Sequence, residues 1–390
     1  MDAIPAGERV RRLRKLRGLT QQDLARLSRL SLRTVKTVEA GEGNPRLETL
    51  HAIARALHVS TSDLTAPGRP EPDPVQPDRW DGVRDALYQR PPGSEPGEPA
   101  TEEGVLAALT ALLPAFRDSR YAQVRDVLPV LIRDALSLGG EGRAARSRVL
   151  NATAWVLTMT RQFDDAMTAG RLALDAAPDV SDSMAAVSVM AWCLLRQGRL
   201  GEAGTLAVDW ADRAEPRFSR ASDGELAAYG KVLLYVNNAM IRDNRPGEAD
   251  DALSLARAAA AKIRRDVPAN ASTTMTFGPA QVQIISAENA VLAGQPDRVL
   301  ALAERVTGAG LARVEPAQRL RHRLDIASAH GMRRQYGDVV AVLAGLRAEA
   351  PEWLAQQRYA RDIIEGVIRR RRGPLSGELR DLAAAVRLPA

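Results

Sequence analysis

The chain has 390 residues, of which 45% are hydrophobic and only 4% aromatic, and its formal net charge is +6. This length suggests two or three domains with aliphatic cores, and the abundance of alanine and leucine over β-branched residues predicts an all-α protein. The single cysteine, Cys193, excludes an intramolecular disulfide. No secretion signal and no membrane-spanning apolar run is visible, so we expect a protein of the reducing cytoplasm with no membrane partner.

The N-terminal zone is basic and has a helical period. Residues 9–36 hold ten Arg or Lys and one acid, Asp23, which leaves ten minus one, or +9. Such a local charge suits a polyanionic partner. A first helix is predicted from about Ala6 to Arg17, where Gly18 favours a left-handed cap.

The next two helices have clear start signals. TQQD, which begins at Thr20, is a capping box, and Ser31 can cap the following helix, LRTVKTVEA. Only a few residues around Arg29 separate the two, which is the spacing of a helix-turn-helix. In the second of them, Val35 and Val38 face the core, and the outward residues are Leu32, Arg33, Lys36 and Thr37. A fourth helix after Asn44-Pro45 and a short fifth helix at STSDL (60–64) complete the predicted module.

The segment LRKLRGLTQQDLARLSRLSLRTVKTVEAGEGNPRLETLHAIARALHVS resembles the Cro/repressor-type (XRE) helix-turn-helix family over nearly all of its five-helix module. The resemblance implies that the start of the third helix reads DNA bases, with Arg33 and Thr37 as base readers and Leu32 against a thymine methyl. It also implies an internal pair between Arg14 and Glu39. The residues that it places at the DNA phosphates are Thr20, Gln21, Gln22, Lys36 and Arg46. The alternative is a charged helical bundle used for protein contacts.

Residues 67–100 are predicted to be a linker after a DNA-binding domain at 1–66. Nine prolines fall between Pro67 and Pro99, and neither a helix nor a central strand tolerates that density. The stretch 78–90 interrupts them with an apolar spacing that predicts a short docking helix.

Residues 101–390 show a repeated helix-pair pattern. Second helices are predicted near DSRYAQV, RQFDDA, RQGRLGEA, RDNRPGEA, AGQPDRV and RQYGDV. Small or modest side chains lie twelve positions apart in each pair: Ala154 with Ala166, Ala191 with Ala203, Asn237 with Ala249, Ala287 with Val299, and Ser328 with Val340. This pattern resembles the tetratricopeptide (TPR) superfamily, and it predicts a TPR-like α-solenoid that senses an effector or forms a dimer.

In such a solenoid the first helices line a concave groove. The candidate effector-groove residues are Arg148, Asn151, Trp155, Ser188, Trp192, Lys231, Asn238, Gln281, Glu288, His322 and Asp325. Asn151 and Asn238 draw attention because an asparagine amide can both donate to and accept from a peptide backbone. The alternative is that these amides are bonded locally and that the solenoid only dimerises.

The chain has no nucleotide-binding glycine loop, hydrolase elbow or metal-ligand spacing, so we expect no enzyme activity, no cofactor and no metal. The sequence predicts a homodimeric transcriptional regulator that binds double-stranded DNA at a palindromic operator, with a peptide or small-molecule effector in the groove. A protein-interaction scaffold and a constitutive repressor with an empty solenoid are the alternatives.

Overall fold

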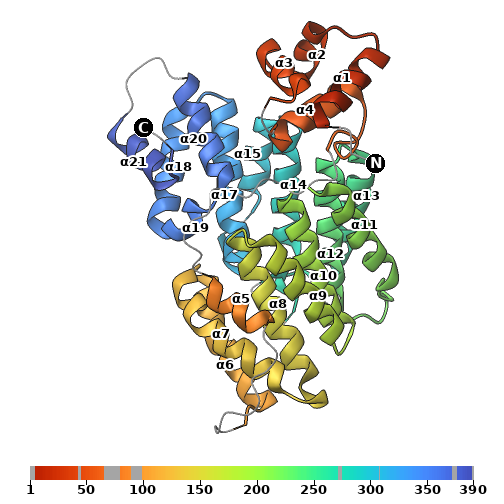
Figure 1. Cartoon of the computed structure of the whole chain (residues 1–390), viewed down its shortest axis with the longest axis vertical. Coiled ribbons are helices and arrows are strands. Elements are labelled where there is room, and N and C mark those ends of the chain that lie inside the picture. Colours follow the sequence, from red (N-terminus) through yellow and green to blue (C-terminus); the bar gives the residue numbers. More distant parts are fainter. Residues whose placement is uncertain are drawn as a thin grey trace.

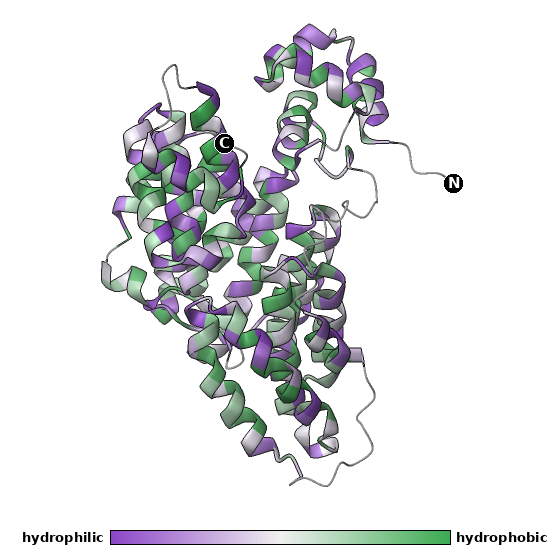
Figure 2. Cartoon of the chain, turned by 60° about the vertical axis from the view of Figure 1, so that its left-hand side comes forward, coloured by the Kyte–Doolittle hydropathy of each residue, from purple (hydrophilic) through white to green (hydrophobic). Residues whose placement is uncertain are grey.

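The computed structural model describes residues 5–42, 45–65, 80–88, 99–270, 275–306, 308–370 and 376–388. Within them the regular structure is α-helical, apart from one 3-10 turn and one short hairpin, as the composition predicted. Figure 1 shows the N-terminal domain, in red, at one end of a curved array of helices. Hydrophilic and hydrophobic residues mix along the helices (Figure 2), and none of the described helices has the length and hydropathy needed to cross a bilayer.

The N-terminal domain consists of α1 (Ala6–Leu16), α2 (Gln21–Ser28), α3 (Leu32–Ala40) and α4 (Leu47–Leu57). These helices surround a core of their own, and its fully buried side chains include Val10, Leu24, Val35, Ile53 and Leu57. The expected fifth helix at 60–64 is a single turn instead, in which the backbone N–H groups of residues 64 and 65 donate to the carbonyl of residue 61. Its hydrogen bonds to the rest of the chain, described below, stabilise this turn.

The C-terminal domain is a stack of helix pairs with the TPR-like arrangement that the sequence predicted. The pairs are α6 (Glu102–Arg117) with α7 (Tyr121–Ser137), α8 (Arg143–Met159) with α9 (Phe163–Ala176), α10 (Val180–Arg196) with α11 (Leu200–Arg213), α12 (Asp223–Arg242) with α13 (Pro246–Ile263), α14 (Pro279–Leu292) with α15 (Pro296–Glu304), α17 (Pro316–Met332) with α18 (Tyr336–Glu349), and α20 (Arg358–Arg370) with α21 (Gly377–Ala385). Three short elements lie between pairs: η1 (Gly140–Gly142), α16 (Gly308–Arg313) and α19 (Pro351–Ala355).

The first helices of successive pairs pack on one another, α8 on α10, α10 on α12, α12 on α14, α14 on α17 and α17 on α20. The small residues predicted at the pair interfaces are buried, and Ala154, Ala191 and Ala203 have no exposed surface. Small side chains there allow paired helices to approach closely. The consequence is a continuous inner wall formed by the first helix of each pair.

A short helix, α5 (Asp81–Tyr88), lies in the segment where the sequence predicted a docking helix. It packs on α7, and Trp80, Val83 and Leu87 join the apolar core of the solenoid. The other parts of the predicted proline-rich linker, 67–79 and 89–98, lie outside the described residues.

The hairpin between α13 and α14 was not predicted. Its strands, β1 (Val267–Pro268) and β2 (Thr276–Phe277), are antiparallel, with Val267 opposite Phe277. The Phe277 ring is fully buried against Gly230 of α12, where an added Cβ would lie 2.1 Å from it. Gly230 therefore makes room for the hairpin on the solenoid wall.

Candidate nucleic-acid interface and effector groove

The caps predicted for α2 and α3 set the position of the third helix. The Thr20 hydroxyl accepts from the Asp23 backbone N–H at 3.1 Å, and the Asp23 carboxylate accepts from the Thr20 N–H in return. Ser31 caps α3 by accepting from the Thr34 N–H at 3.0 Å. Between the helices, Arg29 has φ 57°, a left-handed conformation that costs a non-glycine residue about 1 kcal/mol. The helix-turn-helix geometry is thus formed with arginine in the position where glycine would be least strained.

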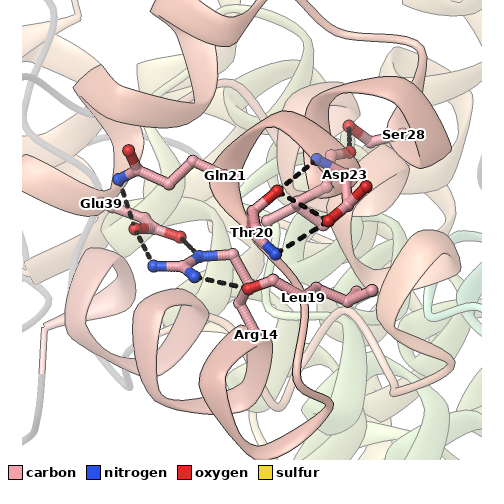
Figure 3. A network of polar contacts seen from close by, with 8 residues as sticks. Arg14, Leu19, Thr20, Gln21, Asp23, Ser28 and Glu39 are labelled. Carbon is pink, nitrogen blue, oxygen red and sulfur yellow. Dashed lines mark hydrogen bonds and ion pairs between the residues drawn. The ribbon is translucent and has the colours of Figure 1, made fainter.

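A buried ion pair joins α1 to α3 (Figure 3). Arg14 Nε donates to Glu39 Oε1 at 2.5 Å and its Nη2 donates to Oε2 at 3.0 Å, while Nη1 donates to the Leu19 carbonyl at 2.7 Å. The Gln21 amide donates to Glu39 at 2.8 Å. Burial by itself would raise the pKa of Glu39, but the hydrogen bonds from Arg14 and Gln21 outweigh it and lower that pKa. The ion pair that the family resemblance implied therefore fixes the position of α1 relative to α3.

The outer face of α3 is open. Leu32, Arg33 and Lys36 are exposed, and Thr37 is half-buried. Neither Arg33 nor Lys36 forms an ion pair within the described part of the chain. A long basic side chain that has no internal partner is free to contact a base edge or a phosphate.

Beside α3 lies a depression of about 610 Å³ at the N-terminus of α2. Its lining residues are Arg11, Arg14, Gly18, Leu19, Thr20, Gln21, Lys36, Glu39 and Ala40. Three of the five predicted phosphate residues, Thr20, Gln21 and Lys36, are thus brought together where the helix N-terminus favours an anion. Two of these three residues also make hydrogen bonds within the domain, since Thr20 caps α2 and Gln21 donates to Glu39. Gln22, another predicted phosphate residue, is exposed and has no such bond among the described residues.

Arg46 is placed differently from what the resemblance implied. Its guanidinium pairs with Asp362 at 2.6 Å and with Glu365 at 2.9 Å, and both carboxylates belong to α20 of the repeat domain. These carboxylates raise the pKa of Arg46 against the opposing effect of burial. As a correction, Arg46 is an interdomain ion-pair residue in this conformation and not a free phosphate clamp.

The N-terminal domain also docks on the turn between α12 and α13. The Arg242 carbonyl accepts from the Thr61 hydroxyl and from His51 Nδ1, each at 2.8 Å. The Asp243 carboxylate accepts from the Ser62 backbone N–H at 2.7 Å and from the Ser62 hydroxyl. Burial lowers the pKa of His51, which favours the neutral ring with its proton on Nδ1. Sequence reasoning missed this interface because no local pattern links residues about 180 positions apart.

A groove of about 1840 Å³ lies between this docked domain and the inner wall of the solenoid. Five of the candidate groove residues line it: Trp155, Trp192, Asn238, Glu288 and Asp325. The Trp155 and Trp192 rings lie 6.3 Å apart, centroid to centroid. The first helices therefore present aromatic and polar side chains to one shared cavity.

The remaining predicted groove residues do not line this cavity. They are buried between neighbouring helices or held in ion pairs, and they comprise Arg148, Asn151, Ser188, Lys231, Gln281 and His322. Lys231, for example, pairs with Glu315 at 3.4 Å, and burial lowers the pKa of His322 to about 4. These residues depart from the prediction for one reason: a first helix has a wide buried face, and side chains one helical step from the groove point into its neighbours.

Charged groups meet at one side of the groove. Glu288 pairs with Arg242 and lies 3.4 Å from Arg321 Nη2, and the Arg321 guanidinium lies 4.2 Å above the Tyr359 ring. Arg321 Nε lies 3.7 Å from Asp325, whose carboxylate oxygens accept no hydrogen bond in the described structure. Burial raises the pKa of Asp325 to about 7, although Arg321 opposes the shift. The Arg242 side chain thus contacts Glu288 in the groove, while its carbonyl accepts hydrogen bonds from the N-terminal domain.

Residues 10–64 match the helix-turn-helix family model. Together with the capped α2–α3 pair and the open α3 face, this match shows an XRE-type helix-turn-helix domain at the N-terminal end, and a TPR-like stack of helix pairs follows it. No curated protein is a significant sequence relative.

Three solved structures are similar at 13% identity. Bacillus thuringiensis PlcR in complex with the peptide PapR7 and DNA has a TM-score of 0.37, with 86% of this chain and 98% of that chain covered. ComR from Streptococcus suis has a TM-score of 0.28, with 88% and 94% covered. ComR from S. thermophilus with DNA and its signalling peptide ComS has a TM-score of 0.21, with 88% and 99% covered.

Proposed function

We propose that this protein is a sequence-specific transcriptional regulator that binds double-stranded DNA as a homodimer and responds to a peptide or small-molecule effector in the groove. A dimer would place two α3 helices in major grooves about 34 Å apart, or a multiple of that distance, on a palindromic operator. The observation that carries the proposal is that α3 is open to DNA while the opposite side of the same domain is bonded to the groove wall.

The base-reading task falls to the N-terminal half of α3. The Arg33 fork can donate two hydrogen bonds to guanine O6 and N7, and Leu32 can contact a thymine methyl. Lys36 and the exposed arginines of α1 supply charge to the phosphates, which adds affinity without sequence preference. Footprinting of the full chain on genomic fragments tests this: a protected palindrome supports it, and uniform or absent protection would favour a protein-interaction scaffold.

The effector would act through the docking interface. Arg242 connects the two sides, because its side chain is bound to Glu288 in the groove and its carbonyl to His51 and Thr61. A ligand that displaces the Glu288 contact would shift the turn that holds the N-terminal domain. The effector then changes DNA affinity by its differential affinity for docked and released states.

Releasing Arg46 tests the direction of this coupling. Removal of both α20 charges by Asp362→Asn with Glu365→Gln frees a cation for phosphate contact, so operator affinity should rise. The slope of log affinity against log salt should steepen by about one. The double variant Asp209→Asn with Glu304→Gln, on other helices and without an ion pair in the described structure, serves as the control. An unchanged salt slope in the α20 variant would contradict the proposal.

A second variant tests the turn itself. Asp243→Ala removes two hydrogen bonds to Ser62, so the N-terminal domain should be released and an effector should no longer change operator affinity. Asp251→Ala, an exposed carboxylate on α13, is the matched control. If the Asp243 variant retained full effector response, the docking interface would not transmit the signal. A wild-type protein with no effector response in any extract would be a constitutive repressor.

A further inference from the structure

Arg196 is a cation in the groove that lacks a counterion among the described residues. It is the last residue of α10, and its guanidinium lies 5.6 Å from the centre of the Trp192 ring. In the described residues it forms no ion pair or hydrogen bond, in contrast to Arg199, which binds Glu202. The Arg196 side chain lines the groove together with Trp155 and Trp192.

A second arginine and several aromatic rings lie near Arg196 in the groove. Arg161 also lines the groove, and its guanidinium lies 5.7 Å from the Phe163 ring. Burial, and to a lesser degree the positive charge of Arg161, lowers the pKa of Arg196 to about 10. The patch formed by the Arg196 guanidinium and the aromatic rings therefore holds one cation without a counterion among the described residues. Such a patch gains from an anion, because buried charges are stable when paired.

A carboxylate fits this patch best. A guanidinium and a carboxylate form two parallel hydrogen bonds, and the aromatic rings beside them can pack on an apolar side chain. The groove volume of about 1840 Å³ exceeds the roughly 300–1000 Å³ of common small-molecule pockets and leaves room for an extended peptide.

We propose that Arg196, flanked by Trp192 and Trp155, is the carboxylate receptor of a peptide effector. This inference rests on the proposed function of the groove. It specifies the ligand as an anionic peptide that carries an apolar residue near its terminal or side-chain carboxylate. Arg196 then supplies specificity, since a neutral peptide would leave the cation unpaired in the groove.

Peptide retention by the full chain tests the inference. The probe is a pool of random seven-residue peptides, made once with free C-terminal carboxylates and once as C-terminal amides. After filtration, mass spectrometry compares the peptides retained by the wild type, by Arg196→Gln, by Arg196→Lys and by the control Arg171→Gln. Arg171 is an exposed residue of α9 that does not line the groove.

The wild type and the Arg171 variant should enrich peptides with a free carboxylate about tenfold or more over their amides, and Arg196→Gln should lose this preference. Arg196→Lys, which keeps the charge but not the fork, should retain part of it. The melting temperature of Arg196→Gln should equal or exceed that of the wild type, because the substitution removes an unpaired cation, and this separates lost binding from lost folding.

Three outcomes would overturn the inference. One is a carboxylate preference that persists in Arg196→Gln, and another is wild-type retention without any carboxylate preference. The third is stabilisation of the wild type, and not of Arg196→Gln, by inorganic pyrophosphate when no peptide is retained, which would make the patch a phosphate site. Retained peptides that shift operator affinity without a carboxylate preference would overturn the inference and leave the proposed function intact.

Discussion

The ion pair between Arg14 and Glu39 provides the sharpest test of how the DNA-binding domain is held together. Replacement of Arg14 by methionine keeps an unbranched apolar stem and removes the guanidinium with its charge. Glu39 is 8% exposed and would then retain one hydrogen bond, from Gln21. The Leu19 carbonyl would also lose its donor. The variant therefore leaves an almost unpaired carboxylate between α1 and α3.

The expected cost is large for a domain of this size. Loss of one partner of a buried ion pair destabilises a protein by about 3–5 kcal/mol. A domain of about 60 residues has a total stability of about 3–9 kcal/mol, from roughly 0.05–0.15 kcal/mol per residue. Arg14→Met should consequently bring the N-terminal domain close to its unfolding threshold, while the solenoid, with its separate core, stays folded.

Native-state hydrogen exchange on the full chain measures this effect locally. Amide protection in the N-terminal core, at Val10, Leu24 and Ile53, should fall by the stated free energy in Arg14→Met. It should not change in the control Arg12→Met, which replaces an exposed arginine of the same helix. The double variant Arg14→Met with Glu39→Leu should recover most of the loss, because no unpaired charge remains. Equal protection in the Arg14 and Arg12 single variants would refute the reasoning.

Three further predictions concern DNA reading, docking and helix packing. Arg33→Ala should cost about 1–3 kcal/mol of operator binding and relax preference at one base pair, whereas Lys36→Ala should weaken all sequences alike and flatten the salt slope; equal losses on every sequence for both would contradict these roles. Because burial lowers the pKa of His51, the docked contact should be fully stable above pH about 6.5 and should weaken as the pH falls through the lowered pKa. Hydrogen-exchange protection of α4 measures this pH dependence, and His51→Gln should abolish it. Gly7→Ala would place a Cβ 2.2 Å from a carbonyl oxygen of α3 and should cost about 1–3 kcal/mol in thermal unfolding, while Gly366→Ala, with open space around it, should cost nothing; similar melting temperatures for both variants would argue against close α1–α3 packing.

Local signals account for the parts of the fold that the sequence predicted. The caps at Thr20 and Ser31 depend on side chains three residues from the backbone groups that they satisfy, so they can be read directly from the sequence. The starts of the second helices follow from short turn motifs in the same way: the helix predicted near RQFDDA begins at Phe163, and the one near RDNRPGEA begins at Pro246. The ion pair of Arg14 and Glu39 was predicted from the family resemblance and not from a local signal.

The groove residues show what local sequence signals could not predict. Helical periodicity places a residue on a face to within about one step, and that step decides whether a side chain meets the cavity or the next helix. Trp192 and Glu288 line the groove, whereas Asn151 and Gln281, predicted from the same periodicity, are buried. The unpaired state of Arg196 depends on which carboxylates the stack brings near it, and that is a property of the whole array.

The amino-acid order by itself determined the helices, their caps, the pairing of the repeats and the basic face of α3, because each depends on groups a few residues apart. Only the tertiary structure decided that Arg46 binds Asp362 and Glu365, and that the Arg242 carbonyl accepts a hydrogen bond from His51 of the N-terminal domain. Those partners lie about 190 to 320 residues apart along the chain. The curvature of the helical stack brings them within hydrogen-bonding distance, and the sum of many small packing angles that sets this curvature leaves no local trace in the sequence.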